Sequence, residues 1–389
     1  MDRLETPCDN CGSRTLDAVY VPQNSHRKAR VCVCATCGLT QSLYSAASRP
    51  KDASTSADAG WGNIRYGKGM HLKRHAPLLD ALLDRRPSAI LDIGSNRGAF
   101  ISYLLDKEAD WSITAVEPDT SVTQTYSGDS RVHFIPGLLE DCRFPDASFD
   151  FIYSSHTLEH ADSAARMLAT TAAALREQGL LFLAVPNLAC IENRCIAEEF
   201  FIDKHSFHFD RDVLTGMFAA AGLRVREEHN TETELLFIAE KAPARMPQPG
   251  NAYAANVRRI AAYTTVLAKN RAALGGIAGR IEAFAAEGPV IVWGAGRIFN
   301  NLAGTGGLDA SRLSLVVDTN LPRYVRELAC GVRVDFPDAL GAFDGTTARV
   351  VILSREYAEE IREECEKRGF SRTVTFDELQ TACLSGQRS

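Results

Sequence analysis

The stretch ILDIGSNRGAF, residues 90–100, decides the fold of this chain. An apolar run suited to a buried strand leads to Asp92, then to two glycines four residues apart, then to an apolar-periodic segment typical of a helix. The pattern predicts a strand, a tight turn and a helix N-terminus. Gly94 and Gly98 permit backbone angles closed to other residues, and the helix end offers unpaired N–H groups. Taken alone, such a turn suits a nucleotide-like ligand or a simple reversal of the chain equally well.

A second predicted strand, SITAVE at residues 112–117, makes the ligand the better interpretation. It ends on Glu117, about twenty residues after the glycines, as in dinucleotide-binding sheets. In a doubly wound sheet this position lets the Glu117 carboxylate accept hydrogen bonds from ribose hydroxyls. The two features together favour a nucleoside-containing ligand.

Four segments in succession resemble the motifs of class I S-adenosylmethionine-dependent methyltransferases (EC 2.1.1). They are LDIGSNRG (91–98), AVEPD (115–119), FPDASFDFIYSSHTLEHA (144–161) and LREQGLLFLAVPN (175–187). The resemblance covers roughly residues 63–240 and implies an α/β, Rossmann-like core with S-adenosylmethionine as cofactor. The cofactor-binding residues that it implies are Asp92, Gly94, Asn96, Gly98, Glu117, Pro118, Leu139, Glu140, Ser154 and His156.

The expected adenine side lies at residues 137–142, where the chain departs from its relatives. Relatives often carry an acid at the position that aligns with Leu138, and that acid accepts a hydrogen bond from the adenine amino group. Here backbone groups from Leu139 to Cys142, or a shifted Glu140 or Asp141, must serve. The glycine turn and Glu117 are unaffected by this difference.

The composition is that of an ordinary soluble protein, and the features below lead us to expect it in the cytoplasm. The 389 residues are 45% hydrophobic and 24% charged, with a net charge of −6, and this length allows two or three domains. Nucleic-acid affinity depends on clustered Lys and Arg, so a nucleic-acid substrate is disfavoured. No apolar run reaches the length of a bilayer span, and no signal-peptide pattern begins the chain. We therefore expect a small-molecule substrate and no membrane partner.

Two Cys-x-x-Cys-Gly knuckles near the N-terminus predict a structural zinc site. Cys8, Cys11, Cys34 and Cys37 can present four thiolates to one tetrahedral ion. Four thiolates leave no open position, so the ion should be structural and not catalytic. Cys32 lies beside the second pair, and we expect it to sit on a strand and face away. Zinc binding, worth roughly 10–16 kcal/mol in zinc-finger peptides, would supply the fold of so small a module.

Candidate catalytic residues follow the predicted central strand, residues 149–155. Ligands of an open parallel sheet bind beyond the carboxyl ends of its strands, which places His156, Glu159 and His160 near the reactive end of the cofactor. For His156 and His160 a structural role remains the alternative, and Glu159 could simply cap a helix. Tyr66 belongs to a glycine- and aromatic-rich segment that either folds over a ligand or forms a surface loop.

The substrate-side loop contains His205. The nucleotide-sugar C-methyltransferases, which the domain order resembles, carry a Glu-His pair in this loop with the histidine as base. Here the pair is Lys204-His205. The missing carboxylate puts carbon deprotonation by His205 in doubt, and Tyr66 is the other candidate base.

The rest of the chain predicts a connector and a second Rossmann-like domain. Residues 251–287 have apolar residues at helical spacing and form one long or broken helix that packs across both flanking domains or makes a dimer. From residue 288 a strand runs into Gly294-Ala295-Gly296, and a second strand ends on Asp318. The third glycine of a dinucleotide site is missing, so scaffolding and ligand binding both stay open.

The predicted order is a zinc module (1–45), a linker (46–62), a methyltransferase core (63–243), a helical connector (244–287) and a C-terminal Rossmann-like domain (288–389). Three hypotheses follow for the function. The first is C-methylation of a keto-deoxysugar carried on a nucleotide, and the second is O- or N-methylation of another small metabolite. The third is a non-catalytic binding or scaffold protein. The sequence leaves both a monomer and a homodimer open.

Overall fold

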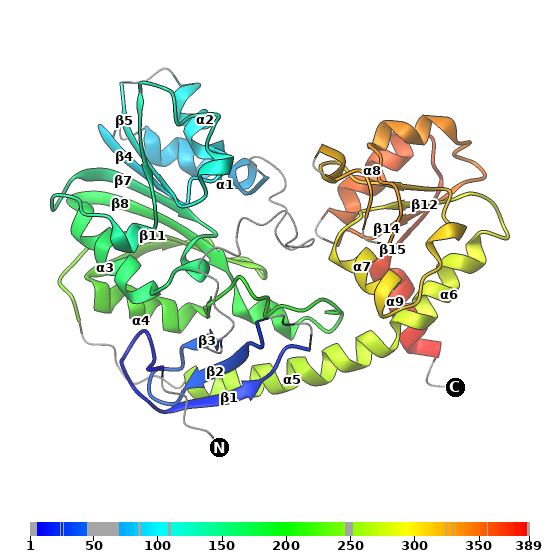
Figure 1. Cartoon of the computed structure of the whole chain (residues 1–389), viewed down its shortest axis with the longest axis horizontal. Helices are drawn as coiled ribbons and strands as arrows, with labels where there is room; N and C mark the ends of the chain where they lie inside the picture. Colours follow the sequence, from blue (N-terminus) through cyan, green and yellow to red (C-terminus); the bar gives the residue numbers. More distant parts are fainter. Residues whose placement is uncertain are drawn as a thin grey trace. The chain divides into compact units, whose positions relative to one another are not determined.

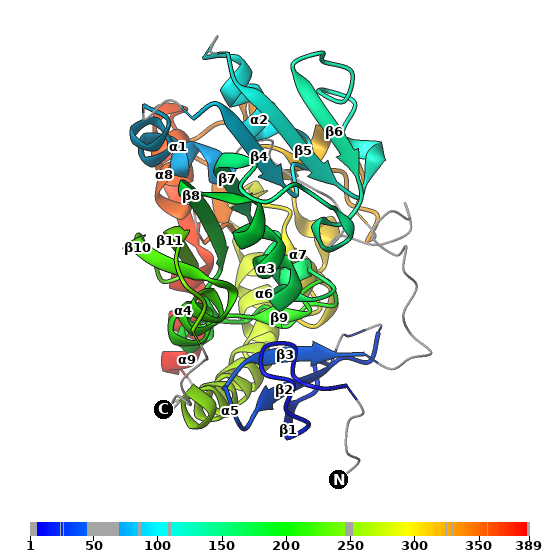
Figure 2. The same cartoon turned by 90° about the vertical axis from the view of Figure 1, so that its left-hand side faces the viewer.

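A computed structural model describes residues 6–44, 70–245 and 252–386, apart from 24, 26, 85, 86, 108, 109, 324, 329 and 356. The predicted linker at 46–62 and Tyr66 lie outside these residues. The chain divides into two compact units, drawn in Figure 1 and turned by 90° in Figure 2. The first holds the N-terminal strands, the core and the start of helix α5. The second holds residues 193–200 and the chain after Ala262.

A seven-stranded sheet forms the centre of the first unit, in the order β10-β11-β8-β7-β4-β5-β6. Strands β8, β7, β4, β5 and β6 are parallel, whereas β11 lies antiparallel between β8 and β10. The strand order reverses beside β4, which makes its carboxyl end the place where such sheets bind ligands. The strands are β4 (Ala89–Ile93), β5 (Ser112–Glu117), β6 (Val132–Pro136), β7 (Phe149–Ser155), β8 (Leu175–Pro186), β10 (Leu223–Glu228) and β11 (Glu234–Lys241).

Helices bury both faces of this sheet, which explains the nearly continuous apolar runs of its central strands. One hydrophobic cluster joins the sheet to α1 (Met70–Leu83) and α2 (Ala99–Leu105). The other joins it to α3 (Ala164–Ala174) and α4 (Arg211–Ala221). The α/β class predicted from the sequence is confirmed.

The N-terminal strands share both a sheet and a core with this domain. Strands β1 (Leu16–Tyr20), β2 (Arg30–Cys34) and β3 (Thr40–Leu43) are antiparallel, and β9 (Phe207–His208) pairs with β3 as a fourth strand. Cys34 and Leu39 belong to the same buried cluster as Leu214 of α4. The N-terminal module is thus completed by a strand that lies in the predicted substrate-side loop.

The second unit contains a parallel sheet in the order β13-β12-β14-β15. The predicted connector is a broken helix, α5 (Ala252–Ala272) followed by α6 (Leu274–Phe284). In the described part of the chain, no helix is both long and apolar enough to span a membrane. The remaining elements are β12 (Val290–Trp293), α7 (Arg297–Gly304), β13 (Leu315–Val317), β14 (Arg349–Ile352), α8 (Ala358–Lys367), β15 (Arg372–Thr375) and α9 (Phe376–Gly386).

Candidate active site

The predicted glycine turn joins β4 to α2, and three of its residues adopt the left-handed backbone conformation that glycine favours. Gly94, Asn96 and Gly98 have φ angles of 72°, 47° and 71°, which lie in the left-handed region. A Cβ on Gly94 would stand 2.2 Å from Oγ1 of Thr157, and one on Gly98 would stand 2.3 Å from the Tyr126 ring. Glycine is therefore needed at both positions for conformation and for space.

Glu117, the last residue of β5, binds the backbone of the glycine turn. Its Oε2 accepts the backbone N–H of Asn96, and its Oε1 accepts that of Asp119, each at 2.9 Å. Glu117 is 3% exposed, so these bonds fix the carboxylate within the turn. A carboxylate oxygen can accept more than one hydrogen bond, so Glu117 also has the capacity to receive ribose hydroxyls. Pro118 follows it directly.

Three buried polar atoms gather at the carboxyl ends of β4 and β7. Oδ2 of Asp92, Oδ1 of Asn96 and Oγ of Ser154 have no hydrogen-bond partner among the described residues. The strands are adjacent, since Ile93 pairs with Ser154. Burial and the nearby Glu117 charge raise the pKa of Asp92 well above its usual range. An unsatisfied buried polar group costs about 1–3 kcal/mol, so this place is suited to a polar ligand.

The predicted adenine residues lie on a short 3₁₀ helix, η4 (Leu139–Asp141). Leu139 is buried in the core cluster that includes α3. The Glu140 carboxylate accepts the backbone N–H groups of Asp162 and Ser163, at 2.9 and 3.3 Å. Glu140 is therefore occupied at the start of α3, which makes Asp141 and the backbone of η4 the better partners for an adenine amino group.

His156 lies between two buried carboxylates, immediately after β7. Its φ is 52°, and its Nε2 lies 2.7 Å from Oε1 of Glu234 on β11. Its Nδ1 lies 3.5 Å from Oε1 of Glu159. Burial lowers the pKa of His156, but the nearby carboxylates of Glu159 and Glu234 outweigh burial and raise it to about 9. Sequence reasoning identified His156 as a site residue but missed Glu234.

Helix α1 supplies two further histidines to Glu234. His75 Nε2 lies 2.9 Å from Oε2 of Glu234, and His71 Nδ1 lies 3.4 Å from Oε1. Burial raises the pKa of Glu234, but the three histidines outweigh burial and lower it. Their spacing of four residues puts His71 and His75 on one face of α1, which is the signal that could have singled them out.

His160 and His205 meet on the other side of Glu159. The carbonyl oxygen of Lys204 lies 3.0 Å from Nδ1 of His160, so Nδ1 carries the proton and Nε2 is the basic nitrogen. That Nε2 is 3.8 Å from Oε1 of Glu159. The rings of His160 and His205 make an edge contact at 4.8 Å. The structure thus gathers His156, His160 and His205 around one buried carboxylate, while Tyr66 lies outside the described residues.

The four predicted zinc ligands come together in the N-terminal module. Sγ of Cys8 lies 3.5 Å from that of Cys37, and Sγ of Cys11 lies 3.6 Å from that of Cys34. The four sulfurs lie within 4.8 Å of one another. Sulfurs about 2.3 Å from a tetrahedral zinc are about 3.8 Å apart, so the residues fit that ion. Cys32 is not in the group; its thiol contacts the Arg30 carbonyl, 3.6 Å away.

The four-cysteine module also holds the loop that carries His205. Tyr44, just after β3, donates its hydroxyl to the carbonyl oxygens of Asp203 and His205, at 3.0 and 3.2 Å. The hydroxyl of Ser25 donates to the Asp203 carboxylate, and the Arg27 guanidinium donates to the Asp203 carbonyl at 3.0 Å. The four-cysteine cluster and the candidate base are thereby connected.

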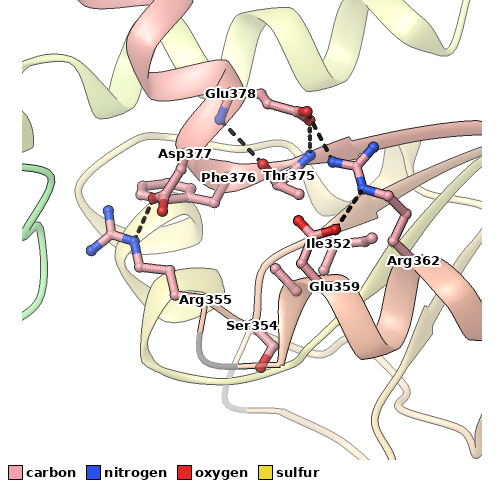
Figure 3. A pocket seen from close by; sticks show the side chains of 10 residues that line it. Ile352, Ser354, Arg355, Glu359, Arg362, Thr375, Phe376, Asp377 and Glu378 are labelled. Atoms are coloured by element: carbon pink, nitrogen blue, oxygen red, sulfur yellow. Dashed lines mark hydrogen bonds and ion pairs between the residues drawn. The ribbon is translucent and has the colours of Figure 1, made fainter. Parts of the chain in front are cut away.

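A cavity of about 290 Å³ lies in the second unit, beside the carboxyl ends of β14 and β15 (Figure 3). Arg355 pairs with Asp377 at 2.6 Å, and Arg362 pairs with Glu378 at 2.9 Å. Since carboxylates offset both guanidinium charges, the cavity has little attraction for a phosphate. At the glycine turn, the Ala295 N–H donates to the Asp318 carboxylate, 3.2 Å away. A scaffolding role and a ligand-binding role for this unit both stay predictions.

One protein family matches a range of residues that lies almost entirely in the first unit. Residues 67–228 match the family Methyltransf_23, described as a methyltransferase domain. The chain therefore carries a methyltransferase domain over these residues. The matched range contains the glycine turn and Glu117. It also contains His156, His160 and His205, and the three residues with buried, unsatisfied atoms, Asp92, Asn96 and Ser154. The enzyme class expected from the sequence is confirmed, and no curated protein matches this methyltransferase significantly.

Many solved structures resemble parts of this methyltransferase. One is 1,6-didemethyltoxoflavin-N1-methyltransferase of Burkholderia thailandensis, with 20% identity over 45% of this chain and 80% of that chain and a TM-score of 0.35. Another is an S-adenosylmethionine-dependent methyltransferase of Mesorhizobium loti. Its identity is 16% over 43% of this chain and 97% of that chain, and the TM-score is 0.37. A third is mitomycin 7-O-methyltransferase. Its identity is 18% over 40% of this chain and 49% of that chain, and the TM-score is 0.33.

Proposed function

We propose that this methyltransferase acts on a small molecule and binds S-adenosylmethionine at the carboxyl ends of β4, β5 and β7. The observation that carries the proposal is the group of buried, unsatisfied atoms of Asp92, Asn96 and Ser154 beside the glycine turn. A bound cofactor with a charged amino acid end would satisfy them. Its sulfonium supplies an activated methyl group, so the protein mainly aligns donor and acceptor, which proximity makes worth roughly 7–11 kcal/mol.

The remaining contacts follow from the strand order. Glu117 at the end of β5 would receive the ribose hydroxyls, as acids at this position do in doubly wound sheets. Pro118 and Leu139 would contact the adenine, and Asp141 or the backbone of η4 would receive its amino group. His156 would lie at the reactive end, since it follows β7 next to the strand that carries the glycine turn.

For the acceptor, we infer C-methylation of a nucleotide-linked keto-deoxysugar. The order of a four-cysteine module, a methyltransferase core and a second parallel-sheet unit supports this proposal, and the net charge of −6 argues against a nucleic acid. Methylation beside a ketone requires a base for the α-proton and a group that stabilises the enolate oxygen. His205 or Tyr66 would be the base, and the edge contact with His160 would help to position the His205 ring.

Hydrogen exchange tests the assignment of the base. A keto-deoxysugar nucleotide is incubated with the enzyme in D₂O without methyl donor, and deuterium at the α-carbon is followed by NMR. We expect exchange with the native enzyme and with His229→Ala, a variant of an exposed histidine in the same unit. His205→Ala should lose most of the exchange, by 10²–10⁴-fold if His205 is the base. Unchanged exchange in His205→Ala would transfer the role to Tyr66.

The second candidate function is O- or N-methylation of another small metabolite. The observation that favours it is Lys204, which stands where the resembling family has a carboxylate. A hydroxyl or amine acceptor makes a lighter demand on the base, and His160 with its basic Nε2 could suffice. Locating the new methyl group in the product by NMR decides between the two, because a methyl on carbon excludes this second function.

A further inference from the structure

His71, His156 and Glu234 form a compact group of potential metal ligands within the first unit. Each offers one ligand atom, and these atoms all lie within 4.8 Å of one another. His71 comes from α1, His156 from the turn after β7 and Glu234 from the start of β11. No short sequence motif links three residues so far apart in the chain, so only the fold reveals the group.

The measured separations suit a single divalent ion. Oε1 of Glu234 lies 2.7 Å from Nε2 of His156 and 3.4 Å from Nδ1 of His71. Adjacent ligands on an octahedral ion are about 3.0 Å apart when each bond is about 2.1 Å. The two observed separations bracket this value. Two histidines and one carboxylate on one face of an ion leave the opposite positions open, as in catalytic iron(II) sites.

A second set of contacts orients these ligands. Nδ1 of His156 lies 3.5 Å from Oε1 of Glu159. Glu159 is 1% exposed, and neither of its carboxylate oxygens has a hydrogen-bond partner among the described residues. His75 Nε2 holds the other oxygen of Glu234 at 2.9 Å. A carboxylate behind a ligating histidine, and a donor behind a ligating carboxylate, are the usual outer contacts of a metal site.

We propose that His71, His156 and Glu234 bind a divalent transition-metal ion that holds an oxygen atom of the methyl acceptor. Imidazole ligands suit an ion such as Fe²⁺, Ni²⁺ or Zn²⁺, and the carboxylate of Glu234 also suits Mn²⁺. The His71 side chain is 46% exposed, so the group is accessible from solvent. The surrounding carboxylates, Glu159 and Glu234, supply the negative charge that a cation needs.

The role of the ion, though not its binding, rests on the proposed function. When the base takes the α-proton, the electron pair of the C–H bond moves toward the ketone, and negative charge develops on its oxygen. The ion would stabilise that charge as a Lewis acid. The α-carbon then forms a bond to the methyl carbon while the bond between methyl and sulfur breaks, and S-adenosylhomocysteine leaves. The proton remains on the base until it is released to water.

Manganese binding tests the proposal on the full chain. The protein is treated with EDTA, the EDTA is removed by desalting, and the zinc content is measured. MnCl₂ is then added while the EPR signal of free Mn²⁺ is recorded. The four thiolates retain zinc and disfavour the harder Mn²⁺, so they do not obscure the measurement. We expect one bound Mn²⁺ per chain in the native protein. His71→Ala should weaken binding at least tenfold, and Glu159→Gln should weaken it by 10–100-fold.

His229→Ala is the matched control, because the His229 side chain is 43% exposed and lies in the same unit but outside the group. It should bind Mn²⁺ as the native protein does. His71 is on the surface, so His71→Ala should keep the native melting temperature and the native affinity for S-adenosylmethionine. The proposal is overturned if the native protein leaves millimolar Mn²⁺ free, or if His71→Ala binds it unchanged. In either case the group is only an ion-pair network.

The two proposals fail in different ways. If Mn²⁺ binds as expected but calorimetry shows no affinity for S-adenosylmethionine, the metal site stands and the proposed function fails. If the methyl donor binds and is turned over but the native protein leaves millimolar Mn²⁺ free, the proposed function stands and the metal site is overturned.

Discussion

The Tyr44 hydroxyl donates a hydrogen bond to the carbonyl oxygen of His205, 3.2 Å away. Tyr44 follows the last strand of the four-cysteine module, whereas His205 lies in the loop before β9 of the methyltransferase core. Strand β9 itself pairs with β3, through Thr40 and His208. The module therefore holds the loop that carries the candidate base His205.

Removal of this hydrogen bond should affect the acceptor more than the cofactor. Tyr44→Phe should cost about 1 kcal/mol of unfolding free energy, a typical net value for a hydrogen bond. We expect a several-fold rise in KM for the acceptor and an unchanged Kd for S-adenosylmethionine. Tyr253→Phe is the control, because its hydroxyl bonds to Asp17 on the exposed side of the same module. Equal effects of the two variants would refute the role of Tyr44.

Loss of zinc should loosen the same loop. Cys34→Ser should reduce bound zinc from one ion per chain toward none and lower the melting temperature, because metal binding supplies folding free energy to such a module. Cys32→Ser should retain the zinc, since Cys32 lies outside the cluster of four sulfurs. Elemental analysis and calorimetry measure the two effects. Zinc loss in Cys32→Ser would mean that the ligand set is wrong.

The glycine turn should not tolerate a side chain. Gly94→Ala combines a φ of 72° with a Cβ placed 2.2 Å from Thr157, so we expect it to cost about 1–3 kcal/mol of unfolding free energy. Gly216→Ala, within α4 and with no atom within 4 Å of its Cβ position, should be neutral or stabilise by about 0.5–1 kcal/mol. Urea unfolding of both variants checks the difference.

His208 should make stability depend on pH. Burial lowers its pKa from 6.5 to about 3. The Ser42 hydroxyl lies 2.8 Å from its Nε2, and the centroid of the His205 ring lies 6.4 Å from that of the His208 ring. Below pH 6.5 the unfolded chain binds a proton that the native chain refuses, so the unfolding free energy falls as pH falls toward 3. At pH 5 the loss attributable to His208 is about 2 kcal/mol.

Urea unfolding at pH 7.5 and pH 5 measures this dependence. His208→Gln should show a smaller loss between the two pH values than the native protein, by about 2 kcal/mol. An identical loss in both proteins would show that other groups account for the acid sensitivity.

The sequence predicts the local parts of this protein well. The strand before Gly94, the strand that ends on Glu117 and the strand over 149–155 are formed by contiguous apolar runs, whose period shows in the sequence. The four cysteines are confirmed as one cluster because two short knuckles carry their spacing. The broken helix over 251–287 likewise follows from local periodicity.

The missed features all depend on long-range packing. Strand β9 has only two residues, too few for a period, and it is a strand because β3 pairs with it. Glu234 meets His75 across 159 residues of sequence, and the antiparallel insertion of β11 beside β8 brings it there. Glu140 likewise binds the start of α3, 22 residues further along the chain, and no residue pattern near Glu140 indicates this contact.

Calorimetric titration with S-adenosylmethionine tests the central claim most directly. The native chain should bind one equivalent with a micromolar Kd. Glu117→Ala should raise that Kd at least tenfold, which is about 1.4 kcal/mol. Glu227→Ala, at an exposed position on β10, should leave it unchanged. No binding at millimolar cofactor, or equal affinity in Glu117→Ala and the native protein, would contradict the cofactor site described here.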